Sequence, residues 1–205
     1  MSKIVIVDYS CGNIDSVNSA VNYHGFKAII TRDPKIISDA DKIILPGQGS
    51  FKIGVNNLKE YGIFDLLRSK ALKDNTPILG ICLGMQILAT VGFENGQEDG
   101  LNLIPGSVEK MKETKLKLPH IGWNEVKISK KNLILKDIED KTDFYFVHSY
   151  RFICEDNNDI LTTTKYEDTF ISSVCKKNIF GVQFHPEKSL VAGLQLIKNF
   201  IHIKC

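Results

Sequence analysis

The chain has 205 residues, of which 43% are hydrophobic and 24% charged, and its formal net charge is +2. These values are typical of a globular protein and predict a single domain spanning residues 1–205, large enough to bury a sizeable core. They argue against nucleic-acid and membrane partners, because the sequence has no basic stripe and no apolar run near the ~20 residues that span a bilayer.

The cysteines give no sign of a disulfide framework. The five are Cys11, Cys82, Cys154, Cys175 and Cys205, an odd number without any C-x-x-C spacing. We therefore expect no metal site and a reducing cytoplasmic location. The first residues, MSKIVIVDYS, become acidic too early for a signal peptide and are expected to begin a buried strand.

In the first half of the chain, short β-rich runs alternate with helical patterns. Strands are expected at residues 4–8, 28–31, 41–45 and 77–82, and helices at residues 13–24, 51–61, 63–73 and 84–90. This alternation predicts parallel strands joined by right-handed crossovers.

The second half is richer in strands. They are expected at residues 108–112, 124–128, 144–152, 160–165, 170–175 and 179–184, with a closing helix at residues 191–202. The fold class is therefore predicted as α/β, with an open mixed, mostly parallel sheet between flanking helices, in a flavodoxin-like three-layer arrangement. Ligands of such sheets bind at the carboxyl ends of the strands, so residues 45–51 and the segment around Cys82 should share one rim.

Cys82 lies in a Gly-x-Cys-x-Gly pattern between an apolar strand and a helix, Gly80 to Gly84. A nucleophile flanked by glycines at a strand-to-helix turn is typical of a nucleophile elbow, in which the turn is sharp and strained. The following helix N-terminus would favour the thiolate. The alternative is a small buried cysteine without chemistry.

His185 and Glu187 are candidates for the base and its orienting group. They follow a β run in the segment GVQFHPEK, and residues i and i+2 of an extended chain point to one side. Together with Cys82 they fit a Cys–His–Glu triad, although a His-x-Glu pair by itself is more often a surface contact. His148, inside an expected strand, is interpreted as structural.

The segment LPGQGSF, residues 45–51, matches neither a dinucleotide fingerprint nor a P-loop. An oxyanion hole fits better, because flanking glycines leave the backbone N–H groups of Gly47 and Gln48 unobstructed. The Leu83 N–H, directly after the nucleophile, would supply the second donor. A simple turn remains an alternative for this segment.

With LPGQGSF, GICLGMQIL and FGVQFHPEKS in this order, the chain resembles the class I glutamine amidotransferases of the triad type. PHIGWNEV, FYFVHSYRF and DYSCGN extend the resemblance, over essentially the whole chain, to the glutaminase subunits of imidazole glycerol phosphate synthases. The resemblance implies that Cys82 attacks the glutamine carboxamide while His185, oriented by Glu187, transfers protons. It also implies substrate contacts, without any cofactor, at Gly49, Gln86, Glu94, Ser149 and Tyr150.

The same resemblance implies a heterodimer in which ammonia passes to a (β/α)8-barrel cyclase subunit. That subunit makes imidazole glycerol phosphate and an aminoimidazole carboxamide ribonucleotide in histidine biosynthesis. The positions expected near the interface are Asn13, Trp123, Asn124 and Lys188, although a Trp123 that is simply buried is an alternative.

Two departures from the family pattern leave the ammonia acceptor open. Ser10 replaces the usual glycine after Asp-Tyr, and Gln48 replaces a small apolar residue between the two glycines. A paralogous glutaminase subunit that supplies another synthase, for example in surface-sugar amidation, is therefore a second hypothesis. A catalytically silent scaffold of the same fold is a third, and the intact Cys82, His185 and Glu187 argue against it.

Overall fold

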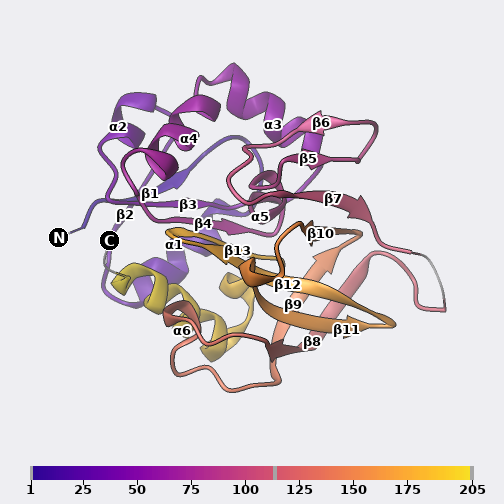
Figure 1. Ribbon diagram of the computed structural model, residues 1–205. Helices are drawn as coiled ribbons and strands as arrows, with labels where there is room; N and C mark the ends of the chain where they lie inside the picture. The colour runs from indigo at the N-terminus through magenta and orange to yellow at the C-terminus, as the bar shows by residue number, and fades with distance from the viewer. Residues whose placement is uncertain (1, 113–114, 204–205) are drawn as a thin grey trace.

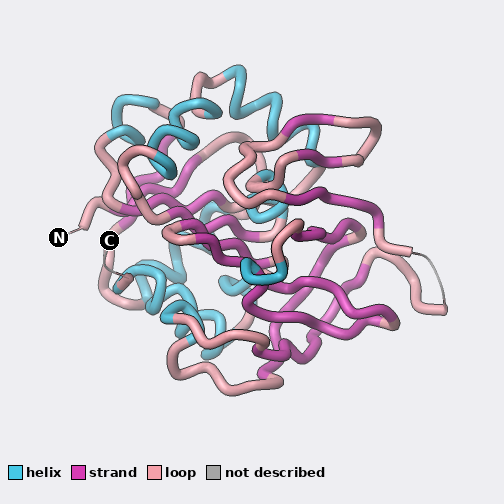
Figure 2. The backbone as a smooth tube through the Cα atoms, viewed as in Figure 1, coloured by secondary structure: helices cyan, strands magenta, loops and turns pink. Residues whose placement is uncertain are grey.

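The computed structural model describes residues 2–112 and 115–203, so Cys205 of the cysteine set lies outside the described residues (Figures 1 and 2). The α-helices are α1 (Ile14–Tyr23), α2 (Pro34–Ser38), α3 (Phe51–Glu60), α4 (Phe64–Leu72), α5 (Leu83–Ile87) and α6 (Leu190–His202). No helix in this part of the chain is long and apolar enough to cross a membrane.

A nine-stranded sheet forms the middle layer, in the order β2-β1-β3-β4-β13-β12-β11-β8-β9. Its strands are β1 (Ile4–Val7), β2 (Ala28–Thr31), β3 (Lys42–Leu45), β4 (Ile78–Ile81), β8 (His120–Ile128), β9 (Thr142–His148), β11 (Ile160–Tyr166), β12 (Asp168–Lys176) and β13 (Ile179–Val182). Along this order, the first five strands, β2-β1-β3-β4-β13, pair in parallel with their neighbours. From β13 onward, through β12, β11, β8 and β9, neighbouring strands pair antiparallel. The predicted α/β class with an open mixed sheet is confirmed.

Alternating side chains of the central strands enter two separate cores, as the period of a β-strand requires. Val5 and Val7 pack on the side of α3 and α4, whereas Ile4 and Ile6 pack on the side of α1 and α6. The helices therefore cover both faces of the parallel half of the sheet (Figure 1). This is the predicted three-layer arrangement.

A second sheet was not predicted. It has the order β10-β7-β5-β6, with β5 (Val91–Gly92), β6 (Glu98–Asp99), β7 (Gly106–Lys110) and β10 (Tyr150–Cys154). The single strand expected at residues 144–152 is wrong, because the chain leaves β9 after His148 and enters the second sheet at Tyr150. The short helix α2 was also missed, although Asp33 caps it and Pro34 opens it.

The central parallel strands end at one rim. Leu45 ends β3 and is followed by the LPGQGSF segment, Ile81 ends β4 directly before Cys82, and Val182 ends β13 three residues before His185. These strands are neighbours, with Leu45 opposite Gly80 and Ile81 opposite Val182. The two segments expected to share a rim therefore do so, and the His185 segment joins them.

We expect Gly84→Ala to destabilise the protein by about 3 kcal/mol or more, because its new Cβ would lie 1.9 Å from the Leu45 carbonyl oxygen. Gly25→Ala is the matched control, since Gly25 has a φ of +76° but open space around it. Its cost should be on the order of 1 kcal/mol. Urea denaturation measures the free energy of unfolding of both variants. Equal losses in the two would contradict the close packing of β3 against the turn that contains Gly84.

Candidate active site

Cys82 occupies a strained turn between β4 and α5. Its φ of 52° and ψ of −107° are unusual for a residue with a side chain, which is the strain expected of a nucleophile elbow. Its N–H donates to the Val182 carbonyl at 2.7 Å, which continues the β4–β13 ladder by one residue. Glycine is required beside it, because a Cβ on Gly80 would lie 2.6 Å from the backbone of Gly84.

His185 and Glu187 form the buried pair that their spacing suggested. The imidazole Nδ1 lies 2.8 Å from Glu187 Oε1, and the two side chains are only 3% and 2% exposed. Three bonds hold the backbone of this turn against β9. The His185 N–H donates to the Tyr145 carbonyl, Ser189 Oγ donates to the His185 carbonyl, and the Tyr145 N–H donates to Ser189 Oγ. The second imidazole nitrogen, Nε2, is buried without a hydrogen-bond partner in the described chain, so it remains available for proton transfer.

The charge of His185 depends on its two neighbours. Burial lowers its pKa, but interactions with the Cys82 thiol and the Glu187 carboxylate outweigh burial and raise the pKa to about 10. His185 is therefore an imidazolium at neutral pH, beside the sulfur and held by a carboxylate. This arrangement provides a proton for a leaving group.

Gln183 also contacts Cys82, and sequence reasoning did not find it. It is completely buried, and its Nε2 lies 3.6 Å from Cys82 Sγ, within the longer range of hydrogen bonds to sulfur. Its Oε1 accepts from Gln86 Nε2 at 3.0 Å. The available signal was the position of Gln183 two residues before His185, which places both side chains on one side of the extended segment.

A cavity of about 190 Å³ opens next to the sulfur of Cys82. Its lining residues are Gln48, Gly49, Cys82, Leu83, Gln86, Glu94, Pro119, Val147, His148, Ser149 and Tyr150. The structure thus brings together all five positions expected to bind substrate. Glu94 accepts from the Phe51 N–H at 2.7 Å and so also fixes the start of α3.

The LPGQGSF segment packs closely against the turn at Cys82. A side chain at Gly47 would come within 2.5 Å of Tyr9 Oη and 2.6 Å of the Gly84 N–H nitrogen. Tyr9 is fully buried and donates to the Pro46 carbonyl at 2.6 Å. Ser10 follows with a φ of 61°, so it keeps the backbone conformation that glycine would adopt there.

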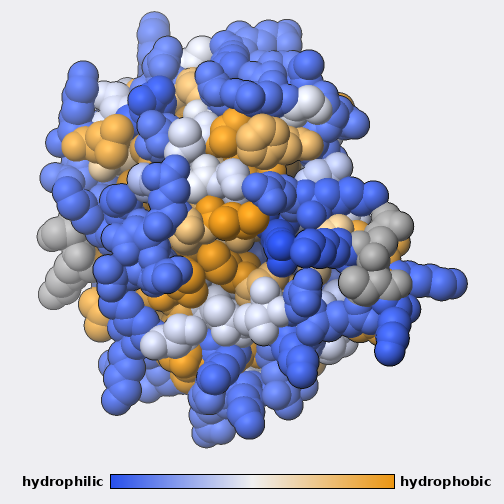
Figure 3. All heavy atoms as spheres, turned by 45° about the vertical axis from the view of Figure 1, so that its right-hand side comes forward, coloured by the Kyte–Doolittle hydropathy of each residue, from blue (hydrophilic) through white to orange (hydrophobic). Residues whose placement is uncertain are grey.

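The positions expected at a subunit interface lie outside the cavity. Trp123 is 48% exposed, so the alternative of a simply buried tryptophan is wrong. Its ring lies 6.0 Å from that of Tyr145, which Lys188 Nζ approaches to 5.9 Å. Asn13 caps α1 through the Ser16 N–H, and Asn124 donates to the Lys165 carbonyl. The face drawn in Figure 3 is largely hydrophilic, with an apolar region at its centre.

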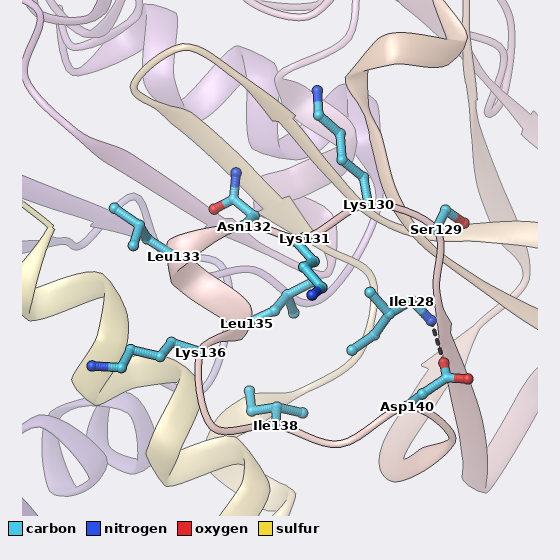
Figure 4. Close-up of a pocket in the computed structure, with 10 residues that line it drawn as sticks. All are labelled: Ile128, Ser129, Lys130, Lys131, Asn132, Leu133, Leu135, Lys136, Ile138 and Asp140. Atoms are coloured by element: carbon cyan, nitrogen blue, oxygen red, sulfur yellow. Dashed lines mark hydrogen bonds between the residues drawn. The ribbon is translucent and has the colours of Figure 1, made fainter.

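A larger cavity, about 990 Å³, lies elsewhere, in the loop that follows β8 (Figure 4). Its lining combines apolar side chains with three lysines, Lys130, Lys131 and Lys136, around the loop. Its lining includes no cysteine and no histidine, in contrast to the smaller cavity at Cys82. Among the described residues, no group of histidine, cysteine, aspartate and glutamate side chains could hold a metal ion.

Comparison with known proteins agrees with this geometry. The family model for glutamine amidotransferase class-I matches residues 5–203. The chain belongs to this family. It is 51% identical to the imidazole glycerol phosphate synthase subunit HisH 2 of Methanococcus maripaludis, over 97% of this chain and 98% of that protein. It is also 44% identical to subunit HisH 1 of Campylobacter jejuni strain RM1221, over 98% and 100% of the two chains.

Solved structures of distant relatives share the fold of this amidotransferase. The structure of PurLQS from Thermotoga maritima superimposes with a TM-score of 0.75 at 19% identity, covering 98% of each chain.

We expect the proton on His185 to make stability depend on pH. A raised pKa means that the folded state holds a proton that the unfolded state releases above about 6.5. The free energy of unfolding should therefore fall as pH rises from about 6.5 to about 10. Glu187→Gln should reduce this fall, because it removes one of the interactions that raise the pKa. Urea denaturation at about pH 6.5 and at about pH 10 measures the fall in the free energy of unfolding. An equal fall in wild type and Glu187→Gln would contradict the role of Glu187 in raising the pKa of His185.

Proposed function

We propose that this chain is the glutaminase subunit of an imidazole glycerol phosphate synthase in histidine biosynthesis. It hydrolyses glutamine to glutamate and ammonia with Cys82, His185 and Glu187. The observation that carries the proposal is the Cys82 sulfur at a cavity of about 190 Å³, backed by the buried His185–Glu187 pair. The names and identities of the curated relatives support the same activity.

In the first half of the reaction, the Cys82 thiolate attacks the carboxamide carbon of glutamine. The C–S bond forms, and the carbonyl oxygen takes the negative charge. When this intermediate collapses, the C–N bond breaks and the His185 imidazolium gives its Nε2 proton to the departing nitrogen, which leaves as ammonia. A γ-glutamyl thioester remains on Cys82. Glu187, at 2.8 Å from Nδ1, keeps the ring oriented throughout.

In the second half, His185 acts as the base. Its neutral Nε2 takes a proton from water, which attacks the thioester carbon. The C–S bond breaks, glutamate forms, and the thiolate–imidazolium pair returns. In both halves backbone N–H groups stabilise the negative oxygen, those of Leu83, Gly47 and Gln48; the proposal is supported by Leu83 and Gln48, which line the cavity.

The other residues around the cavity hold the amino-acid end of glutamine. Glu94 binds the α-amino group by charge, and the backbone at Gly49, Ser149 and Tyr150 binds the α-carboxylate. Gln86 reaches the cavity from α5 and contacts the substrate there. A cavity of about 190 Å³ suits one small amino acid.

The partner is a (β/α)8-barrel cyclase subunit that receives the ammonia, in a cytoplasmic heterodimer. Asn13, Trp123, Asn124 and Lys188 contact it. Exposed apolar side chains near these positions in the sequence support an interface there: Ile121 is 60% exposed, Leu190 72% and Val191 81%. The free thiols of four cysteines suit a reducing compartment.

A second acceptor is the alternative function. Gln48 is exposed at the cavity rim, where the family has a small apolar residue, and both relatives named above carry a number in their names. A paralogous subunit with the same triad would supply ammonia to another synthase. The two acceptors are distinguished by identifying which barrel protein activates the glutaminase activity of this chain.

We expect Cys82→Ala to abolish glutamine-dependent product formation by the complex with the barrel subunit. With free ammonia, the same complex should form product at close to the wild-type rate, because the acceptor chemistry belongs to the partner. Product formation from each nitrogen source is the measurement. Glutamine-dependent turnover that survives in the variant would refute Cys82 as the nucleophile. Failure of the wild-type complex with both nitrogen sources would refute the assigned acceptor.

A further inference from the structure

The sulfur of Cys82 has polar neighbours that do not belong to the triad. Its thiol donates toward the Val147 carbonyl, with 3.8 Å between sulfur and oxygen, and Gln183 Nε2 lies 3.6 Å from the same sulfur. Gln183 is completely buried, and its backbone N–H donates to the Ser172 carbonyl at 2.9 Å, which continues the pairing of β13 with β12. A firmly held side-chain amide therefore lies at the reacting atom.

The orientation of the Gln183 carboxamide follows from the hydrogen bonds around it. The Tyr150 carbonyl can only accept, so the Gln86 atom that lies 3.2 Å from it is the nitrogen Nε2. This nitrogen can only donate, so the Gln183 atom that lies 3.0 Å from it is the oxygen Oε1. Gln183 therefore turns its Nε2 toward the Cys82 sulfur, and the contact to the sulfur is made by an N–H donor.

A donor at this sulfur has a different value in the two halves of the reaction. Hydrogen bonds to a charged acceptor are roughly twice as strong as those between neutral groups. In the γ-glutamyl thioester the sulfur is neutral, and it gains a negative charge as the C–S bond breaks. The N–H of Gln183 therefore binds the departing sulfur more strongly than the thioester, which lowers the barrier to hydrolysis. In the first half, charge moves away from the sulfur to the carbonyl oxygen, so the same donor does not accelerate the attack.

We propose that Gln183 is a further catalytic residue, whose N–H stabilises the Cys82 sulfur as the leaving group when the thioester is hydrolysed. Water adds its oxygen to the thioester carbon and gives one proton to His185 Nε2. The electron pair of the C–S bond goes to the sulfur, and the other water proton leaves with the new carboxyl group, which ionises in solvent. The inference rests on the proposed glutaminase function, and it gives the second half of that reaction a residue outside the triad.

Gln183→Met tests this role, because methionine is unbranched and of similar length but has no N–H. We expect hydrolysis of the thioester to slow about tenfold, the factor that corresponds to about 1.4 kcal/mol. A larger fraction of Cys82 should then carry the γ-glutamyl group during turnover. The value of kcat/KM for glutamine should stay near wild type, because it includes only the steps up to the release of ammonia.

The measurement uses the complex with the barrel subunit at saturating glutamine. Acid quenching followed by mass spectrometry gives the fraction of Cys82 that carries the thioester, and its decay after a chase with unlabelled glutamine gives the rate of hydrolysis. Gln183→Asn is a second variant, which keeps a polar carboxamide in the buried position but shortens the side chain by one methylene. It should accumulate the thioester as well, because its N–H no longer reaches the sulfur.

Ser172→Ala is the matched control. Ser172 is completely buried in β12, where its carbonyl accepts from the Gln183 backbone and its hydroxyl lies 2.8 Å from that of Thr162. The substitution removes this hydroxyl pair from the same strand pairing but changes no group at the sulfur, so thioester hydrolysis should stay near the wild-type rate.

Three results would overturn the inference alone. They are wild-type hydrolysis in both Gln183 variants, an equal slowing in Ser172→Ala, and a fall in kcat/KM as large as the fall in the rate of hydrolysis. The last two are expected of a residue with a purely structural role. A wild-type complex that forms no thioester and releases no glutamate would instead overturn the proposed function.

Discussion

The site depends on the parallel pairing of β4 with β13. Ile81 lies opposite Val182, and the Cys82 N–H donates to the Val182 carbonyl at 2.7 Å. This register places the residue after β4 beside the residues after β13, although about a hundred positions separate them in the sequence. A shift of one residue would turn either Cys82 or Gln183 and His185 away from the cavity. Cys82 and His185 are therefore as accurately placed as the ladder itself.

The pairing of β3 with β4 adds the second requirement, which is close approach without side chains. The Leu45 carbonyl occupies the space in which a Cβ on Gly84 would lie, and Tyr9 occupies that of a Cβ on Gly47. The two glycine-containing segments that end β3 and β4 are thus packed against one another. The strain at Cys82 is supported by this contact and by the ladder bond on its other side, as expected for a strained residue at a functional site.

The sequence was sufficient to predict the contact between His185 and Glu187 and the parallel half of the sheet, because each has a local signal. Glycines flank Cys82, a β run precedes His185, and helical patterns alternate with apolar strands. The end of β9 at His148 had no such signal, because the residues of the segment 144–152 other than Ser149 read as one continuous strand. Gln183 lies within an apolar strand pattern, and the contact between His120 and His148 joins residues 28 positions apart. Such contacts come from tertiary pairing, which one sequence does not reveal.

The central claim is that Cys82 is the one sulfur that the fold prepares for attack on glutamine. The direct measurement is mass-spectrometric mapping after incubation with a glutamine analogue that carries an electrophilic carbon in place of the carboxamide. The account predicts a single adduct on Cys82, formed more slowly when glutamine is present. An adduct on another of the five cysteines, or labelling of Cys82 that glutamine does not slow, would contradict it.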